Sequence, residues 1–272
     1  KSLVKLGLYV FTYRSYGSYI KGGHNFNVIS FSNKPIYSHE SEFDVIISLD
    51  ERTIEEHIRE AKEDCIILCD SCRIKAKNVF LLDSKEIVKG LQVQEISRNL
   101  VFLGYLFKVF GFEFSALEET IKEEFGEKSV EAAKKGYEKA SIFRKIEVPV
   151  EKGKKIFVDG TTSIGLAAIR YGLDFYFAYP MTPATPLLHF LSSIKNRFDI
   201  RTFILENEIA VVNASIGANF AGAVSMVGTS GGGFDLMSET LSLQGMTEVP
   251  LVVYLAQRAG PSTGMPTYTT VS

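Results

Sequence analysis

Phe177-Ala178-Tyr179-Pro180-Met181-Thr182-Pro183-Ala184-Thr185 is a run in which an apolar strand gives way to a turn that contains two prolines. Proline fixes its own backbone and lacks the donor that a strand ladder or helix interior needs, so the run predicts a turn between a strand and a helix. Three further apolar segments end in polar or glycine-rich runs: Glu206-Asn207-Glu208-Ile209-Ala210, Thr229-Ser230-Gly231-Gly232-Gly233-Phe234 and Gln257-Arg258-Ala259-Gly260-Pro261-Ser262-Thr263-Gly264. An α/β fold presents its chemistry at such strand ends.

The second half of the chain alternates between short apolar strands and helices. The predicted strands are Phe175–Ala178, Thr202–Leu205, Ala223–Gly228 and Pro250–Gln257, and the predicted helices are Thr161–Tyr171, Ala184–Lys195, Glu208–Ala221 and Phe234–Gln244. This alternation is typical of an α/β domain.

The first half alternates in the same way and then becomes helical. Runs rich in β-branched and aromatic residues predict a mostly parallel sheet with strands at Leu8–Phe11, Phe26–Phe31, Asp44–Leu49 and Cys65–Leu68. Residues 51–63 are predicted to form a helix with Asp50 as its N-cap. Lysine- and glutamate-rich segments with apolar residues three or four apart predict amphipathic helices over 97–110, 115–125 and 129–144.

The segment 146–155 interrupts this pattern with proline, glycine and charged residues, which indicates a boundary between domains. We therefore expect one domain over residues 1–148 and a second over residues 154–272. Both ends look cut, because the chain starts inside a predicted helix and stops after a strand and loop that leave the second sheet without a closing element. We expect it to be part of a longer polypeptide.

The composition is that of an ordinary globular protein. Hydrophobic residues make up 46% and charged residues 23% of the chain, and the net charge is −2. This balance gives no reason to expect nucleic acid or a membrane as a partner. No stretch approaches the ~20 apolar residues of a membrane span, and the first residues are not a signal peptide, so a cytoplasmic location is expected.

Three cysteines, Cys65, Cys69 and Cys72, lie close together in the sequence. A cubane iron–sulfur cluster needs four thiolates and a structural zinc site needs four ligands, so one ligand is missing. Cys65 and Cys69 also lie in an apolar run that predicts a buried strand. We interpret the cysteines as core thiols and assign no metal site to this chain.

Two glutamates, Glu206 and Glu208, stand between a predicted strand and a predicted helix. Glu208 begins a helix rich in alanine and glycine, which permits close packing. A carboxylate at a helix N-terminus is stabilised by the helix dipole whether or not it has a chemical role. The pattern alone therefore leaves a structural and a catalytic role open, and Glu206 is a rival for the latter.

Together these runs resemble the α subunit of the 2-oxoacid:ferredoxin oxidoreductases, in the form that carries the γ domain fused at its N-terminus. The resemblance covers nearly the whole chain and is strongest from Tyr179 to Thr269. It implies a Rossmann-like γ domain over residues 1–148, and over residues 154–272 a domain that receives the pyrimidine ring of thiamine diphosphate. The implied reaction is the oxidative decarboxylation of a 2-oxoacid with coenzyme A, which gives acyl-coenzyme A, carbon dioxide and reduced ferredoxin.

Cofactors and partners also follow from the resemblance. A separate β subunit would hold the diphosphate, its Mg²⁺ ion and a 4Fe-4S iron–sulfur cluster, a need that the cysteine count supports. Ferredoxin would accept the electrons, in an αβ or (αβ)2 assembly.

The resemblance assigns roles to particular residues. The family's Glu-Asp-Glu-Ile-Ala-Ala run appears as Glu206-Asn207-Glu208-Ile209-Ala210-Val211, which makes Glu208 the carboxyl that activates the cofactor through a pyrimidine ring nitrogen. A hydroxyl and an arginine are expected to hold the substrate carboxylate. The substrate-binding residues are then Tyr179, Thr182 and Arg258, and the cofactor-binding residues are Ser230, Gly231, Ser262 and Thr263.

Several positions depart from the family pattern. Met181 replaces isoleucine, Gly232 replaces proline, and Tyr268 stands where relatives often carry a basic residue, which points to a different 2-oxoacid preference. The run Tyr16–Asn25 resembles the γ-domain signature with Lys21 in place of arginine. Its histidine, His24, fits a structural turn or an interface loop, and the glycine-rich loop that opens this domain in relatives would lie upstream of Lys1.

Two other functions are compatible with these residues. Another thiamine-dependent enzyme, such as a non-oxidative decarboxylase or a synthase, would share the activating glutamate but would not depend on ferredoxin and coenzyme A. A degenerate subunit that only binds a partner would retain its activity in the complex when Glu208 becomes alanine.

Overall fold

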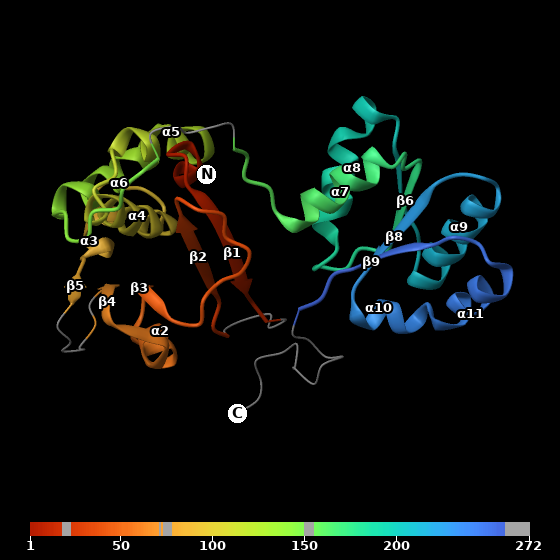
Figure 1. Ribbon diagram of the computed structural model, residues 1–272, viewed down its shortest axis with the longest axis horizontal. Coiled ribbons are helices and arrows are strands. Elements are labelled where there is room, and N and C mark those ends of the chain that lie inside the picture. Colours follow the sequence, from red (N-terminus) through yellow and green to blue (C-terminus); the bar gives the residue numbers. More distant parts are fainter. Residues whose placement is uncertain (18–22, 71, 73–77, 150–154, 259–272) are drawn as a thin grey trace. The chain divides into compact units, whose positions relative to one another are not determined.

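The computed structural model describes residues 1–17, 23–70, 72, 78–149 and 155–258 (Figure 1). The chain divides into two compact units, the first from Lys1–Arg14 and Asn27–Phe157 and the second from Ser15–Phe26 and Val158–Ser272. The change from one unit to the next lies beside the proline- and glycine-containing segment 146–155. Composition gives no sign that Ser15–Phe26 groups with the second unit.

The strands of the first unit form two sheets. β1 (Tyr9–Ser15) pairs with β2 (Phe26–Ser32), whereas β3 (Phe43–Ser48), β4 (Ala61–Cys69) and β5 (Val79–Leu81) form a parallel sheet in the order β3-β4-β5 (Figure 1). The predicted parallel pairing is confirmed for β3, β4 and β5, whereas the prediction of a single sheet is wrong, because β1 and β2 form a sheet of their own.

Side chains of β4 alternate between two apolar clusters, as the period of a strand requires. Ile66 and Leu68 pack in the large cluster that also contains residues of α4 (Arg98–Val109) and α6 (Glu127–Lys139). Cys65, Ile67 and Cys69 lie in a smaller cluster with Ile54 of α2 (Glu51–His57). Both faces of the sheet are thus covered by helices.

Helices α4 and α6 approach closely at two glycines. A Cβ atom built on Gly104 would lie 1.8 Å from the Ala133 carbonyl oxygen, and one on Gly136 would lie 1.9 Å from that of Val101. Only glycine fits where two helix backbones lie this near. The remaining helices of the first unit are α1 (Ser2–Lys5), α3 (Ser84–Gly90) and α5 (Phe114–Phe125).

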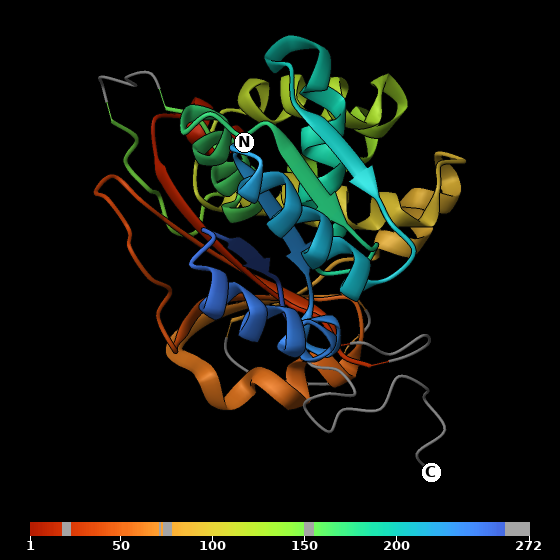
Figure 2. The same ribbon diagram turned by 90° about the vertical axis from the view of Figure 1, so that its right-hand side faces the viewer.

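The second unit contains one parallel sheet in the order β7-β6-β8-β9. In chain order its elements are α7 (Gly160–Arg170), β6 (Phe175–Ala178), α8 (Thr185–Phe198), β7 (Arg201–Ile204), α9 (Glu208–Phe220), β8 (Ser225–Thr229), α10 (Gly231–Leu236), α11 (Ser238–Thr247) and β9 (Val252–Leu255). In Figure 2 the green β6 and the cyan β7 arrows point the same way.

Helices cover both faces of this sheet. Tyr176 and Ala178 pack with residues of α7 and α8, whereas Phe177 packs with residues of α9 and α11, so consecutive side chains of β6 enter opposite cores. Figure 1 shows α7 and α8 on one side of the sheet and α9 and α11 on the other. This arrangement confirms the predicted α/β class. Among the described residues, no helix has the length and apolar character needed to cross a membrane.

Two element predictions are wrong in detail. The helix predicted over 51–63 ends at His57, and after a short 3₁₀ turn β4 begins at Ala61, which pairs with Phe43. The single helix predicted over Phe234–Gln244 is two helices that meet at the buried Met237. The Asp50 N-cap is confirmed, because its side chain accepts a hydrogen bond from the Thr53 amide at 2.9 Å.

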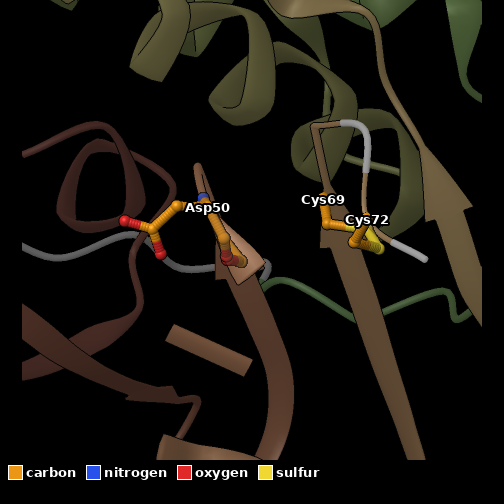
Figure 3. Close-up of a disulfide and its surroundings, with 4 residues drawn as sticks. Asp50, Cys69 and Cys72 are labelled. Carbon is orange, nitrogen blue, oxygen red and sulfur yellow. A yellow bond between two sulfur atoms is a disulfide. The ribbon is translucent and has the colours of Figure 1, made fainter. Parts of the chain in front are cut away.

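The cysteine prediction holds for one residue of three. Cys65 and Cys69 are buried in β4, with 6% and 1% of their surface exposed. Cys69 is not a free thiol, however, because it forms a disulfide with Cys72, with 6.0 Å between the Cα atoms (Figure 3). β4 ends at Cys69, and Cys72 returns to the same apolar cluster, where it packs.

Candidate functional site at the carboxyl edge of the sheet of the second unit

The predicted site residues follow strands that end at one level of the sheet. Ala178 pairs with both Ile204 and Gly228, and Thr229 pairs with Leu255. Because all four strands are parallel, the segments that follow them leave the same edge. The first three motifs, and the described start of the fourth at Gln257 and Arg258, therefore follow strands that end at the carboxyl edge of this sheet.

Glu208 is the buried carboxylate of this edge. It is the first residue of α9 and is 7% exposed, whereas its rival Glu206 is exposed. Asn207 caps the helix by accepting a hydrogen bond from the Ala210 amide at 2.8 Å. Within the described ranges no donor hydrogen-bonds the Glu208 carboxylate, which leaves the helix N-terminus as its main electrostatic support.

Gly233 brings three motifs together around Glu208. A Cβ atom built on this glycine would lie 2.3 Å from Thr229 Oγ1, 2.7 Å from Met181 Sδ and 2.8 Å from Glu208 Cγ. Real Cβ atoms do not approach other heavy atoms so closely, so any larger residue here would force these side chains to shift. The contact joins the proline turn, the glutamate run and the glycine turn into one cluster.

The proline turn is held by its own backbone. The Met181 carbonyl oxygen accepts hydrogen bonds from the Ala184 amide at 2.8 Å, and from the Thr185 amide and hydroxyl at 2.9 Å each. Thr229 Oγ1 also donates to Met181 Sδ at 3.7 Å. Tyr179 and Thr182, the predicted substrate residues of this turn, are exposed, and neither forms part of the Gly233 cluster.

The other predicted residues lie on the turns after β8 and β9. Ser230 and Gly231 are half-buried at the start of α10, where the Ser230 side chain makes no capping hydrogen bond. Arg258 is half-buried, and its guanidinium carbon lies 5.8 Å from the centre of the Tyr16 ring, a cation–π distance. Ser262, Thr263 and Tyr268 lie outside the described residues.

The chemistry of this edge fits a cofactor with a nitrogen heterocycle. No donor among the described residues hydrogen-bonds the carboxylate of Glu208, which is 7% exposed, so its oxygens are available to accept a hydrogen bond from a ligand. Gly231 and Gly232 have no side chain beyond hydrogen and begin a helix beside the carboxylate, which allows a flat ring to approach. The residues present therefore fit the aminopyrimidine end of thiamine diphosphate.

Sequence reasoning missed the supporting residues of the cluster. Thr229, Gly233 and Tyr16 enter the site through contacts between segments distant in the chain, which no local pattern encodes. The three consecutive glycines at a helix start do predict a close approach of backbone, but not which residues Gly233 contacts. A cavity of about 680 Å³ lies at the opposite edge of the sheet beside Arg201, and none of the predicted site residues lines it.

Comparisons with known proteins agree with this geometry. The pyruvate ferredoxin/flavodoxin oxidoreductase family model matches residues 1–140, and the thiamine diphosphate-binding domain model of the pyruvate flavodoxin/ferredoxin oxidoreductases matches residues 166–272. The 2-oxoacid:ferredoxin oxidoreductase subunit alpha of Sulfolobus sp is 27% identical, over all of this chain and 53% of the relative. The 2-oxoglutarate oxidoreductase subunit KorA of Mycobacterium tuberculosis is 38% identical, over 64% of this chain and 29% of the relative.

A solved structure shows the same fold. It is the 2-oxoglutarate:ferredoxin oxidoreductase from Magnetococcus marinus with 2-oxoglutarate, coenzyme A and succinyl-CoA bound, which has a TM-score of 0.83 and 29% identity over 97% of this chain and 50% of that chain. This chain thus spans about half the length of the Sulfolobus and Magnetococcus proteins. Because the first family model covers just over half of the chain and the named relatives are of one kind, the chain belongs to the 2-oxoacid:ferredoxin oxidoreductase family.

Proposed function

We propose that the chain is part of a 2-oxoacid:ferredoxin oxidoreductase that converts a 2-oxoacid and coenzyme A to acyl-coenzyme A and carbon dioxide and passes two electrons to ferredoxin. The environment of Glu208 supports this proposal most directly. The residue is 7% exposed, and no donor among the described residues hydrogen-bonds its carboxylate. The relatives favour this reaction over a non-oxidative thiamine enzyme, since they are named as ferredoxin or 2-oxoglutarate oxidoreductases.

The proposed role of Glu208 is to hold a proton at a nitrogen of the cofactor's pyrimidine ring. Thiamine diphosphate, when bound, supplies a nucleophilic carbon and an electron sink for decarboxylation. The Glu208 carboxyl would hydrogen-bond a nitrogen of the pyrimidine ring and hold the proton at that atom. The contact with Gly233 and Met181 limits where the Glu208 side chain lies.

The substrate residues hold a carboxylate until it leaves as carbon dioxide. The exposed Thr182 supplies a hydroxyl between two prolines that restrict the backbone, and Arg258 supplies a positive charge for the 2-oxoacid. Tyr179 completes this group of substrate residues. Ser230 and Gly231 are assigned to the cofactor, as are Ser262 and Thr263 of the stretch that follows Arg258.

A second subunit completes the enzyme in this proposal. The fit of this chain is to the pyrimidine ring, so a β subunit is assigned the diphosphate, Mg²⁺ and a 4Fe-4S cluster, in an αβ or (αβ)2 assembly. Cys65 is buried and Cys69 is paired with Cys72, so these residues offer no free thiolates for a cluster.

The test is anaerobic reduction of a low-potential dye by the protein with its partner. A panel of 2-oxoacids that includes pyruvate and 2-oxoglutarate is supplied with and without coenzyme A. Reduction that requires both the acid and coenzyme A is expected. Dye reduction that proceeds equally without coenzyme A, or no reduction by a complex loaded with thiamine diphosphate and cluster, would contradict the proposal.

A further inference from the structure

A cysteine pair with two residues between its members lies in the first unit, apart from the residues assigned above. Cys69 is the last residue of β4, and its sulfur is bonded to that of Cys72 (Figure 3). The carboxyl ends of β3 and β4 are neighbours, and Asp50 follows β3 at this edge with its carboxylate turned away from the disulfide (Figure 3). Reactive groups of α/β proteins lie at such edges.

The Cys69 end of the pair is fixed in place. The Cys69 carbonyl oxygen accepts a hydrogen bond from the Leu82 amide at 2.9 Å, and the Asp70 amide donates to the Ser48 carbonyl oxygen at 3.2 Å. The Asp70 carboxylate, which has no exposed surface, accepts from Ser84 Oγ at 2.6 Å and from Arg98 Nη2 at 2.7 Å. Asp70 is thereby committed to Arg98 and is not a ligand or base for the sulfurs.

The two sulfurs differ in access. Cys69 is 1% exposed and packs with Ile46, Ile54 and Ile67, whereas Cys72 is half-buried and only borders this cluster. Thiol–disulfide exchange proceeds by attack of a thiolate along an accessible path to one sulfur. Cys72 is therefore the more exposed residue of the pair and the more accessible one for a small thiol.

The pair joins no distant elements. A disulfide stabilises a fold mainly by closing a long loop in the unfolded chain. This one joins residues only three positions apart, so it contributes little stability in that way. In α/β proteins, a spacing of two residues between cysteines is typical of pairs that change redox state. The third cysteine, Cys65, lies in the interior of β4, where burial raises the pKa of its thiol to about 11, so it does not serve as a third partner.

We propose that Cys69 and Cys72 form a site of reversible thiol–disulfide exchange with low-molecular-weight thiols, in which Cys72 is the sulfur that is attacked. The thiolate forms a bond to Cys72 Sγ, the bond to Cys69 Sγ breaks, and Cys69 leaves as a thiolate that takes up a proton. A second thiol then attacks the sulfur of the first, which releases Cys72 and a small disulfide. The protein disulfide gains two electrons, and the two small thiols lose them.

The first experiment uses the native protein without any substitution. It is equilibrated in buffers with different ratios of reduced to oxidised glutathione, quenched with acid and alkylated in denaturant. After proteolysis, mass spectrometry measures the mass of the peptide that contains Cys69 and Cys72. We expect both thiols to appear together at a single midpoint while Cys65 is alkylated in every buffer. A pair that keeps one redox state across the series while the protein stays folded would overturn the proposal.

The second experiment separates the two sulfurs. Cys69→Ser leaves the half-buried Cys72, and Cys72→Ser leaves the buried Cys69. With oxidised glutathione, Cys69→Ser is expected to form the mixed disulfide at least about ten-fold faster, because exchange rates depend on access. Equal rates, or faster reaction of Cys72→Ser, would show that Cys72 is not the attacked sulfur. Should either variant fail to fold, the glutathione titration of the unsubstituted protein still decides whether the pair exchanges.

Discussion

Replacement of Gly233 by alanine should disturb the site in proportion to the contacts that the new methyl group makes. The added Cβ atom would lie within 3.0 Å of Thr229 Oγ1, Met181 Sδ and Glu208 Cγ. Thr229 is fully buried in β8 and has few rotamers, so its side chain moves little to relieve the clash. Overpacking of this kind costs about 1–3 kcal/mol.

Gly232→Ala is the matched control, because a Cβ atom at Gly232 meets nothing within 4 Å. Both glycines lie in α10, so both variants gain the same helix propensity of about 1 kcal/mol. The difference between them isolates the clash and should be about 1–3 kcal/mol in favour of Gly232→Ala.

Native-state hydrogen exchange measures this difference locally, as the free energy of opening at the amides of β8 and α9. It avoids the assumption that a chain of two units unfolds in one step. We also expect thiamine diphosphate to bind more weakly to Gly233→Ala than to the unsubstituted protein, since the new methyl group displaces Glu208. Equal opening free energies in the two variants would refute the close contact around Gly233.

Three further predictions concern packing and titration. Gly104→Ala should lower the free energy of unfolding by at least about 3 kcal/mol, because its Cβ would lie 1.8 Å from the Ala133 carbonyl oxygen. Gly90→Ala is the control and should not destabilise the protein, because its Cβ would meet nothing within 4 Å. Denaturant unfolding, followed by the helical circular dichroism signal, compares the two variants. Tyr176→Phe should be neutral or stabilising by about 1 kcal/mol in the same assay, because the buried hydroxyl lacks a partner among the described residues, and a loss above about 1 kcal/mol would reveal one. Native alkylation of Cys65 at pH 8 should be roughly 100-fold slower than that of an ordinary thiol, since its pKa is raised from 9.0 to about 11. As unfolding would return that pKa to 9.0, Cys65 lowers stability progressively as pH rises above 9, and reaction at the ordinary rate would show that it is exposed.

The sequence predicts the second unit well because its elements carry local signals. Pro180 and Pro183 mark the end of β6 and the start of α8, and the helix that begins at Glu208 does so in the structure. The choice between Glu206 and Glu208 needed the resemblance, and burial of Glu208 alone now supports it.

Predictions fail where contacts between distant residues decide the outcome. β5 has three residues, too few for a periodic signal, and is held by its pairing with β4. β4 extends back to Ala61 through charged residues, because Phe43 of β3 pairs there. The pairing of Cys69 with Cys72 was hidden by the apolar run that contains Cys69, since that run fits a buried thiol equally well. The position of Gly233 against Thr229 likewise depends on the fold of the whole unit.

The most direct test of the central claim compares Glu208→Gln with Glu206→Gln in the dye-reduction assay, with saturating 2-oxoacid, coenzyme A and thiamine diphosphate. Glutamine keeps the size of the side chain but not its acid–base function, and Glu206 is an exposed neighbour of the same charge. We expect a loss of about 10²–10⁴-fold in kcat for Glu208→Gln and of less than about three-fold for Glu206→Gln. Equal activity in both variants, or a larger loss for Glu206→Gln, would contradict it.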